Sequence, residues 1–221
     1  MVFYIQFQYK NTDWSDMEST QPQTTRGRPK TLNRDHVLQV AMKSYWGDGP
    51  TAVSINEICR RAGVSKPGLY REFGNEDDLK TAALESYREL GLSQLFEIFE
   101  ADQPFDEALA ALTGLALQDR AQTGLPTGCL FGKMRGCRSE LGPKTNGAID
   151  ATWSTAQDRM QDWIDRAKRN GQLDRQISTT TATLYVDAQI ANAITMQAEG
   201  VQKAEISEFL QIAFNGLKCF G

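Results

Sequence analysis

The stretch from Ser54 to Phe73 constrains the fold of this 221-residue chain more than any other. Ser54 followed three residues later by Glu57 is a capping box, which predicts the start of a helix with the glutamate reaching back to the cap. Gly63 can adopt the positive φ that ends a helix, and Ser65 can cap the next one. Two short helices joined by so tight a turn predict a helix-turn-helix, whose second helix enters the major groove of DNA.

The second helix of this motif has one apolar face and one small or cationic face. Leu69 and Phe73, four residues apart, are predicted to face the core. The opposite face suits contact with bases and phosphates. The alternative interpretations are that Tyr70 only covers the core and that Arg71 is only solvated. The candidate DNA-binding residues of the motif are Ser54, Ser65, Lys66, Pro67, Gly68, Tyr70 and Arg71.

A basic arm precedes the motif and makes the charge of the chain uneven. Arg26, Arg28 and Lys30 are predicted to reach phosphates or the minor groove, the alternative being a solvated charge cluster. Residues 26–73 carry nine Lys or Arg against four Asp or Glu, whereas residues 74–221 carry 14 against 21. A basic head on an acidic body is typical of a nucleic-acid-binding protein whose remainder has another role.

The run from Gly27 to about Leu84 resembles the DNA-binding domain of the TetR family of repressors. The matching pieces, in order, are GRPK, RDHVLQVAMKSYW, SINEI, AGVSKPGLYREF and DDL. A later run, GCLFGKMRGCRSELGP from Gly128 to Pro143, is similar to the start of the C-terminal domain in one TetR subgroup. The resemblance implies that the Tyr70 hydroxyl contacts a phosphate. It also implies that the last two helices pair with those of a second copy.

Hydrophobic periodicity predicts an all-α chain of nine helices without a convincing strand. The expected helices cover about 34–46, 55–61, 66–72, 76–99, 105–121, 129–140, 144–169, 179–198 and 203–218. The expected domains are a flexible extension at 1–25, a helix-turn-helix DNA-binding domain at 26–80, and an effector-binding and dimerisation domain at 81–221. The extension has several open interpretations: a dispensable tail, a short strand or docking segment, or translation from upstream of Met17.

The body is predicted to hold an effector pocket and a dimer interface. Aromatic and Met side chains are typical pocket liners, although the same stripes also form plain cores. The candidate effector-binding residues are Tyr87, Phe96, Phe131, Met134, Trp153 and Met160. The candidate dimer interface, on the last two helices, comprises Leu184, Ala188, Ala191, Ile194, Ile206, Phe209, Leu210, Ala213 and Leu217.

The inventory of reactive residues argues against catalysis. His36 is the only histidine and lies in the predicted head, so no His-rich metal site and no Ser-His-Asp arrangement is expected, and no cofactor is implied. Cys129 and Cys137 lie near several cations, which can activate a thiol, whereas the alternative is two small buried side chains. No apolar run is long enough to span a bilayer and the cysteines form no tight framework, so a cytoplasmic location is expected.

Together these features predict a homodimeric repressor, not an enzyme, that binds a palindromic operator and is released by a small-molecule effector. One alternative is a thiol-based redox or electrophile sensor on the same scaffold, using Cys129 and Cys137. A second alternative, from another class, is a small-molecule-binding or enzymatic helical domain whose head does not bind DNA.

Overall fold

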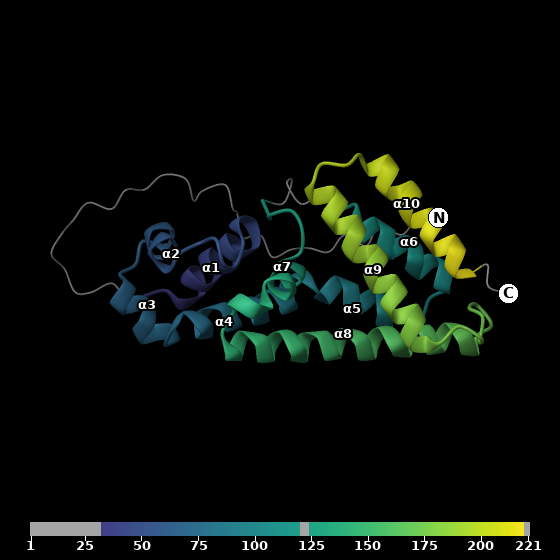
Figure 1. The fold of residues 1–221 in the computed structure, drawn as a ribbon, viewed down its shortest axis with the longest axis horizontal. Coiled ribbons are helices and arrows are strands. Elements are labelled where there is room, and N and C mark those ends of the chain that lie inside the picture. The colour runs from purple at the N-terminus through teal and green to yellow at the C-terminus, as the bar shows by residue number, and fades with distance from the viewer. Residues whose placement is uncertain (1–31, 120–123, 219–221) are drawn as a thin grey trace. The chain divides into compact units, whose positions relative to one another are not determined.

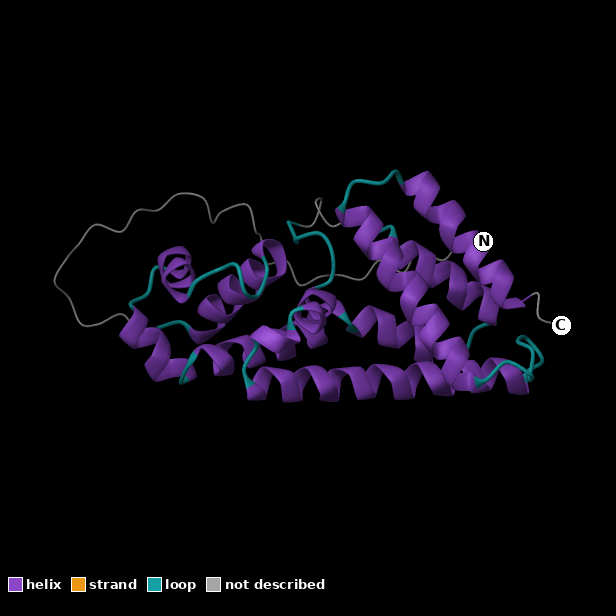
Figure 2. Ribbon diagram, viewed as in Figure 1, coloured by secondary structure: helices purple, strands orange, loops and turns teal. Residues whose placement is uncertain are grey.

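The computed structural model describes residues 32–119 and 124–218, and every regular element within them is helical (Figure 1). The elements are α1 (Arg34–Asp48), α2 (Ile55–Ala62), α3 (Lys66–Phe73), α4 (Glu76–Gly91), α5 (Ser93–Glu100), α6 (Phe105–Ala116), α7 (Leu130–Gly136), the 3₁₀ helix η3 (Arg138–Glu140), α8 (Pro143–Arg169), α9 (Thr179–Ala198) and α10 (Lys203–Lys218). Figure 2 shows no strand in this part of the chain, so the all-α class is confirmed. The predicted extension at 1–25 and the basic arm of Arg26, Arg28 and Lys30 lie outside the described residues.

The first four helices begin where the sequence places capping side chains. Asn33, Ser54, Ser65 and Asn75 each accept a hydrogen bond from the backbone N–H three residues further on. These bonds satisfy amides that have no partner inside their own helix. The turn between α2 and α3 is set by Gly63, whose φ of 66° lies in the left-handed region that a residue with a Cβ adopts only at a cost.

The helix predicted from 76 to 99 is interrupted, and this raises the number of α-helices in the described residues from nine to ten. α4 ends at Gly91, and Leu92, with φ −103° and ψ −12°, separates it from α5. A glycine at the end of a turn lowers helix propensity, while apolar residues continue at helical spacing on both sides. Periodicity alone therefore could not reveal the break. Similarly, α7 ends at Gly136 and is followed by η3, where a single helix over 129–140 was expected.

The end of α1 is bound into the body of the molecule. The Trp46 ring packs edge-on against Tyr87 of α4, with ring centroids 4.8 Å apart, and its indole N–H donates to the Gly128 carbonyl at 3.1 Å. Lys133 of α7 donates to the carbonyl of Gly47 at 3.2 Å and also binds that of Trp46. The residues from Leu32 onward form one compact unit, and the predicted boundary between 80 and 81 stays a prediction.

The 27-residue helix α8 organises the body. It packs against α4, α5 and α9, and α9 pairs in turn with α10 (Figure 1). Its inner face carries Ile149, Ala156, Met160 and Ile164, all buried, at the spacing of an amphipathic helix. No helix in the described part combines the length and apolar character needed to cross a bilayer.

Candidate DNA-binding interface and sites in the body

The exposed face of α3 carries the predicted contact residues. Leu69 and Phe73 are buried, as expected, at 0% and 8% exposure. On the other side, Ser65, Lys66, Pro67 and Arg71 are exposed, while Gly68 and Tyr70 are half-buried; Ser54, at the start of α2, is exposed as well.

Lys66 and Tyr70 form a pair on this face. The Lys66 ammonium lies 5.6 Å from the centre of the Tyr70 ring, so one cation and one phenol are presented together. Gly68 also has an internal role, because a Cβ there would lie 3.0 Å from the Ser65 Oγ that caps the helix. The first turn of α3 therefore exposes one ammonium and little side-chain bulk.

Glu57 does not complete the capping box in the way the sequence predicts. Its carboxylate accepts hydrogen bonds from Arg60 and Arg61 at 2.7–2.8 Å, and the bond from Arg60, followed by that from Arg61, lowers the pKa of Glu57 to about 2. Arg61 also donates to Asp48 and Ser44 of α1. The capping-box pattern did not indicate the two arginines as partners of the glutamate, and Arg61 also links α2 to α1.

A contact that sequence reasoning missed ties the start of α1 to the end of α3. Arg34 lies 3.4 Å from the Glu72 carboxylate, and its guanidinium stands 5.0 Å from the centre of the Phe73 ring. Both partners are at helix ends that are 38 residues apart, so no local pattern signals the contact. It ties the end of α3 to the start of α1 through both the Glu72 carboxylate and the Phe73 ring.

Three acidic residues in the first turn of α4 are each engaged within the chain. Glu76 pairs with Lys80 at 2.7 Å, Asp78 pairs with Lys144, and Asp77 accepts hydrogen bonds from the start of α8. Negative side chains at a helix start stabilise the helix, although they reduce its attraction for phosphate. The cationic tip of α3, and not the start of α4, is thus the positive feature of this surface.

Residues 37–83, which comprise most of α1, all of α2 and α3, and the first half of α4, match the family model described as bacterial regulatory proteins of the tetR family. This region is a DNA-binding domain of the TetR family of transcriptional regulators. The members of this family are DNA-binding regulators and not enzymes.

Known proteins extend this TetR-family likeness beyond the head. The HTH-type transcriptional repressor ComR of Escherichia coli K12 is 26% identical over 198 residues, covering 88% of this chain and 91% of ComR. A TetR regulatory protein from Rhodobacter sphaeroides has a similar fold, with a TM-score of 0.72 at 19% identity, covering 83% of this chain and 98% of that one. A cysteine mutant of CifR, solved with a 26-base-pair operator, shares the fold with a TM-score of 0.66 at 18% identity, over 86% and 100% of the two chains.

The six predicted effector residues are dispersed through the core of the protein. Tyr87, Phe131, Met134 and Met160 are buried, and Trp153 is half-buried under the Arg135 guanidinium, which lies 3.8 Å from its ring centre. Phe96 differs, because it borders a recess of about 500 Å³ between α4, α5 and α8. The recess is lined by Arg88, Glu89, Ser93, Phe96, Glu97, Glu100, Thr155 and Arg159.

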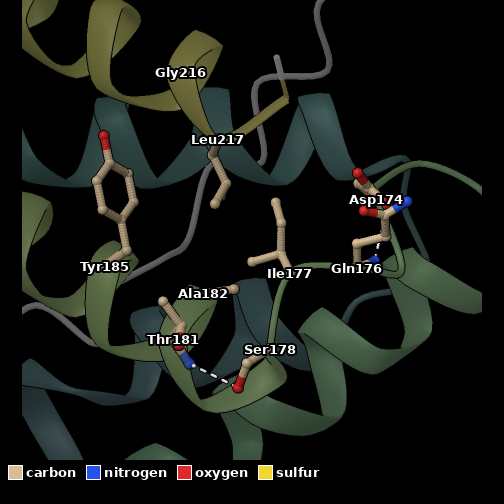
Figure 3. A pocket seen from close by; sticks show the side chains of 9 residues that line it. All are labelled: Asp174, Gln176, Ile177, Ser178, Thr181, Ala182, Tyr185, Gly216 and Leu217. Carbon is tan, nitrogen blue, oxygen red and sulfur yellow. Dashed lines mark hydrogen bonds between the residues drawn. The ribbon is translucent and has the colours of Figure 1, made fainter. Parts of the chain in front are cut away.

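A larger cavity of about 610 Å³ lies where the α8–α9 loop meets the start of α9 and the end of α10 (Figure 3). Ile177 and Leu217 reach into it from opposite sides, and Tyr185 borders it while donating to the Ala213 carbonyl at 3.0 Å. None of the six predicted effector residues lines this cavity, whose lining is Asp174, Gln176, Ile177, Ser178, Thr181, Ala182, Tyr185, Gly216 and Leu217.

The predicted dimer residues divide into two groups. Leu184, Ala188 and Ala191 of α9 are exposed, and Ile194 and Phe209 are half-buried. The remaining four are buried against helices of the same chain at 0–7% exposure: Ile206, Leu210, Ala213 and Leu217. Sequence reasoning missed Ile212 of α10, which is 66% exposed.

The two candidate thiols have different surroundings. Cys129 is half-buried at the start of α7, and its sulfur accepts hydrogen bonds from the Tyr87 hydroxyl and the Gly132 N–H, both at 3.4 Å. Burial, followed by the charge of Glu140, raises the pKa of Cys137, which makes this thiol a poor nucleophile at neutral pH. In the described residues, no group of three or more His, Cys, Asp or Glu side chains is placed to hold a metal.

Proposed function

We propose that this protein is a homodimeric repressor that binds a palindromic operator and is released by a small-molecule effector. The observation that carries the proposal is the capped α3, with Lys66 and Tyr70 side by side on its exposed face. Phosphate contacts by such groups position a recognition helix, and base contacts beside them give sequence choice. Lys66 is assigned to a base edge or a phosphate, and Tyr70 to a phosphate.

The proposal is tested by gel shift with duplex DNA from the intergenic region next to the gene. Tyr70→Phe and Lys66→Ala should each weaken binding while the helical circular-dichroism signal is unchanged. Arg169→Ala is the matched control for Lys66→Ala, because it removes an exposed cation at the far end of α8. Equal binding by all of these variants would show that the contact assignment is wrong.

The proposed dimer uses the outward face of α9 and α10. One exposed stripe of α9, at steps of three and four, consists of small or apolar residues: Thr181, Leu184, Ala188, Ala191, Thr195 and Ala198. Two of the large apolar side chains that stay exposed in the chain, Leu184 at 49% and Ile212 at 66%, lie on these two helices. The apolar face formed by these two helices is removed from water when a second copy packs against it. Two copies also supply the two recognition helices that a palindrome requires.

The effector is proposed to bind the recess beside Phe96. Of the two cavities described above, this one touches α4, the helix that leaves the DNA-binding head. Its walls come from both sides of the break at Leu92 and from α8, so a ligand there contacts elements on either side of the interruption. Arg159, which stands 4.4 Å over the Phe96 ring and pairs with Glu100, is the proposed polar contact for the ligand.

A ligand can shift the protein from the DNA-binding state only by its difference in affinity for the two states. Arg159→Ala should therefore reduce release from DNA by a ligand found in a thermal-shift screen, and leave DNA binding without ligand unchanged. Arg169→Ala again serves as the charge-matched control. A ligand that releases both variants equally would place the effector site elsewhere.

A second candidate function, thiol sensing, is favoured by the surroundings of Cys129. Two donors converge on its sulfur, and one of them, Tyr87, packs against Trp46 at the end of α1. Modification of this sulfur would displace Tyr87 and disturb that contact. The test is the loss of DNA binding after treatment with hydrogen peroxide. Cys129→Ser should become insensitive, whereas Cys137→Ser should respond like the wild type; equal sensitivity in all three would remove this candidate.

A further inference from the structure

The first turn of α4 is hydrogen-bonded to the first turn of α8 through one carboxylate. Asp77 accepts bonds from the backbone N–H of Lys144 at 2.9 Å and of Thr145 at 3.0 Å, and from the Thr145 hydroxyl at 2.6 Å. Thr145 is fully buried, and its hydroxyl also lies within 3.3 Å of the Thr81 hydroxyl, one turn further along α4. Three donors from α8 thus converge on a single side chain of α4.

These bonds replace a cap that α8 does not have. The residue before α8 is Gly142, which offers no side chain to the free amides of the first turn. Asp77, 67 residues away from Lys144 in the sequence, provides the acceptor instead, and its negative charge also suits the positive end of a helix. The cap of the longest helix in the body is therefore a residue of the helix that starts directly after the helix-turn-helix.

The contact between Asp77 and the start of α8, called the joint from here on, leaves no room for a side chain at position 142. A Cβ on Gly142 would lie 2.2 Å from the Asp77 Cγ, which is too close for two carbon atoms that are not bonded to each other. The backbone of Gly142, with φ −73° and ψ 167°, is one that any residue can adopt. Alanine at this position would consequently act only through its contact with Asp77, by pushing the start of α8 away from α4.

The joint lies next to the DNA-reading surface. Asp77 is three residues after Gly74, the residue that ends α3, and the neighbouring Asp78 pairs with Lys144. A displacement of the start of α8 is therefore carried to the start of α4 and to the end of α3. Because α8 packs against α9 in the body, the same contacts relate α3 to the helices of the proposed dimer face.

We propose that Asp77 is a positioning residue for DNA binding: by capping α8 from α4, it fixes the orientation of α3 relative to the body. The proposal rests on the homodimer proposed above, in which that orientation sets the separation of the two recognition helices. Two half-sites are recognised together only when their separation on the DNA matches that of the helices. A loosened joint should accordingly relax the required spacing, while each α3 still contacts its own half-site.

The experiment compares affinities for DNA of different half-site spacing. The probes are duplexes recovered by the wild-type protein from a random-sequence pool, with the centre lengthened or shortened by one to four base pairs, and a duplex with one half-site. Asp77→Asn weakens the cap, and Gly142→Ala pushes the joint apart by a different route. Glu85→Gln is the control for a lost charge on α4, because Glu85 is exposed on the same helix, and Gly147→Ala is the control for α8, because a Cβ there meets nothing within 4 Å.

The wild type and both controls should discriminate against altered spacing by about tenfold or more, within the range of coupling between two sites. Asp77→Asn and Gly142→Ala should discriminate several-fold less and bind the single half-site as the wild type does. Hydrogen exchange should also be faster at the amides of Lys144 and Thr145 in Asp77→Asn. A purely structural role would weaken binding to every probe equally.

Unchanged spacing profiles in both joint variants would overturn the proposal, as would an equal relaxation in Glu85→Gln. If one joint variant fails to fold, the other decides between these outcomes. A wild-type protein that recovers no duplex from the pool would instead refute the DNA-binding function, so the two failures are distinguishable.

Discussion

The exposed tip of α3 and the outward face of α9 are both surfaces that the protein leaves uncovered, but they differ in chemistry and in how far the sequence predicts them. The tip presents Lys66, Tyr70 and Arg71 on a short helix whose start is fixed by the Ser65 cap. The α9 face presents Leu184, Ala188 and other small or apolar residues on a 20-residue helix without acidic or basic residues in its end turns. The tip of α3 suits binding to a charged polymer, and the α9 face suits packing against the same face of a second copy.

The largest expected effect tests whether the α9 face brings two copies together. Leu184→Asp should convert a dimer into a monomer, measured by light scattering, because an unpaired carboxylate would be buried at the interface. Operator affinity should fall by about 100-fold, the scale of a central interface residue. Leu90→Asp, which places the same charge at another exposed leucine outside α9 and α10, is the control and should stay dimeric. A dimeric Leu184→Asp protein would assign pairing to another surface.

The next effect separates residues that pack within one chain from those available to a second copy. Leu210 is fully buried and Ile212 is 66% exposed, although both lie on α10. In a monomeric Leu184→Asp background, Leu210→Ala should lower the free energy of unfolding by about 2–5 kcal/mol through lost contacts and a cavity. Ile212→Ala should change it by about 0.5 kcal/mol or less, as exposed substitutions do. Urea denaturation measures both, and similar losses would contradict the division.

A smaller effect concerns the cation at the tip of α3. If Lys66 contacts a phosphate, Lys66→Ala should reduce the slope of log affinity against log salt concentration by about 1, uniformly across DNA sequences. If it contacts a base edge, the loss should instead depend on the sequence at one position. Arg169→Ala should leave the slope unchanged. Fluorescence anisotropy at several salt concentrations distinguishes these outcomes.

The smallest effect is the pH dependence of the joint between α4 and α8. Burial acts to raise the pKa of Asp77, but the Thr145 hydroxyl and the amides of Thr145 and Lys144 outweigh it and hold the pKa below its ordinary value of 3.8. Because the folded pKa is depressed, this stabilisation is present above the unfolded value and is lost as pH falls through the folded one. The stability difference between wild type and Asp77→Asn should therefore be constant near neutral pH and shrink in acid. A difference that instead grew below pH 4 would contradict this assignment.

The contrast between the two surfaces also explains what the sequence could predict. Caps at Ser54 and Ser65 and the left-handed turn at Gly63 depend on residues a few positions apart, so the helix-turn-helix followed from local chemistry. On α10, apolar residues occur on more than one face, and only the packing of neighbouring helices separates the buried Leu210 from the exposed Ile212. The dimer contacts predicted from residue type and from the family resemblance therefore include residues that are buried within one chain, such as Leu210.

Contacts between distant parts of the chain were the least predictable. The Asp77 cap on α8 joins residues 67 positions apart, and in the sequence Asp77 reads only as one of three acids at a helix start. The Arg34–Glu72 pair has the same character. The break at Leu92 was hidden because apolar spacing continues through it, so helix length was overestimated where nothing in the pattern changed.

That break has a consequence for how such a regulator can diversify. The 16 residues of α4 extend about 24 Å and end at this break, beyond which α5 begins as a separate helix. Residues beyond Leu92 therefore belong to a different helix from the one that begins at the DNA-binding head. Substitutions in α5, which lines the recess proposed for the effector, can thus alter that recess without changing a residue of α4.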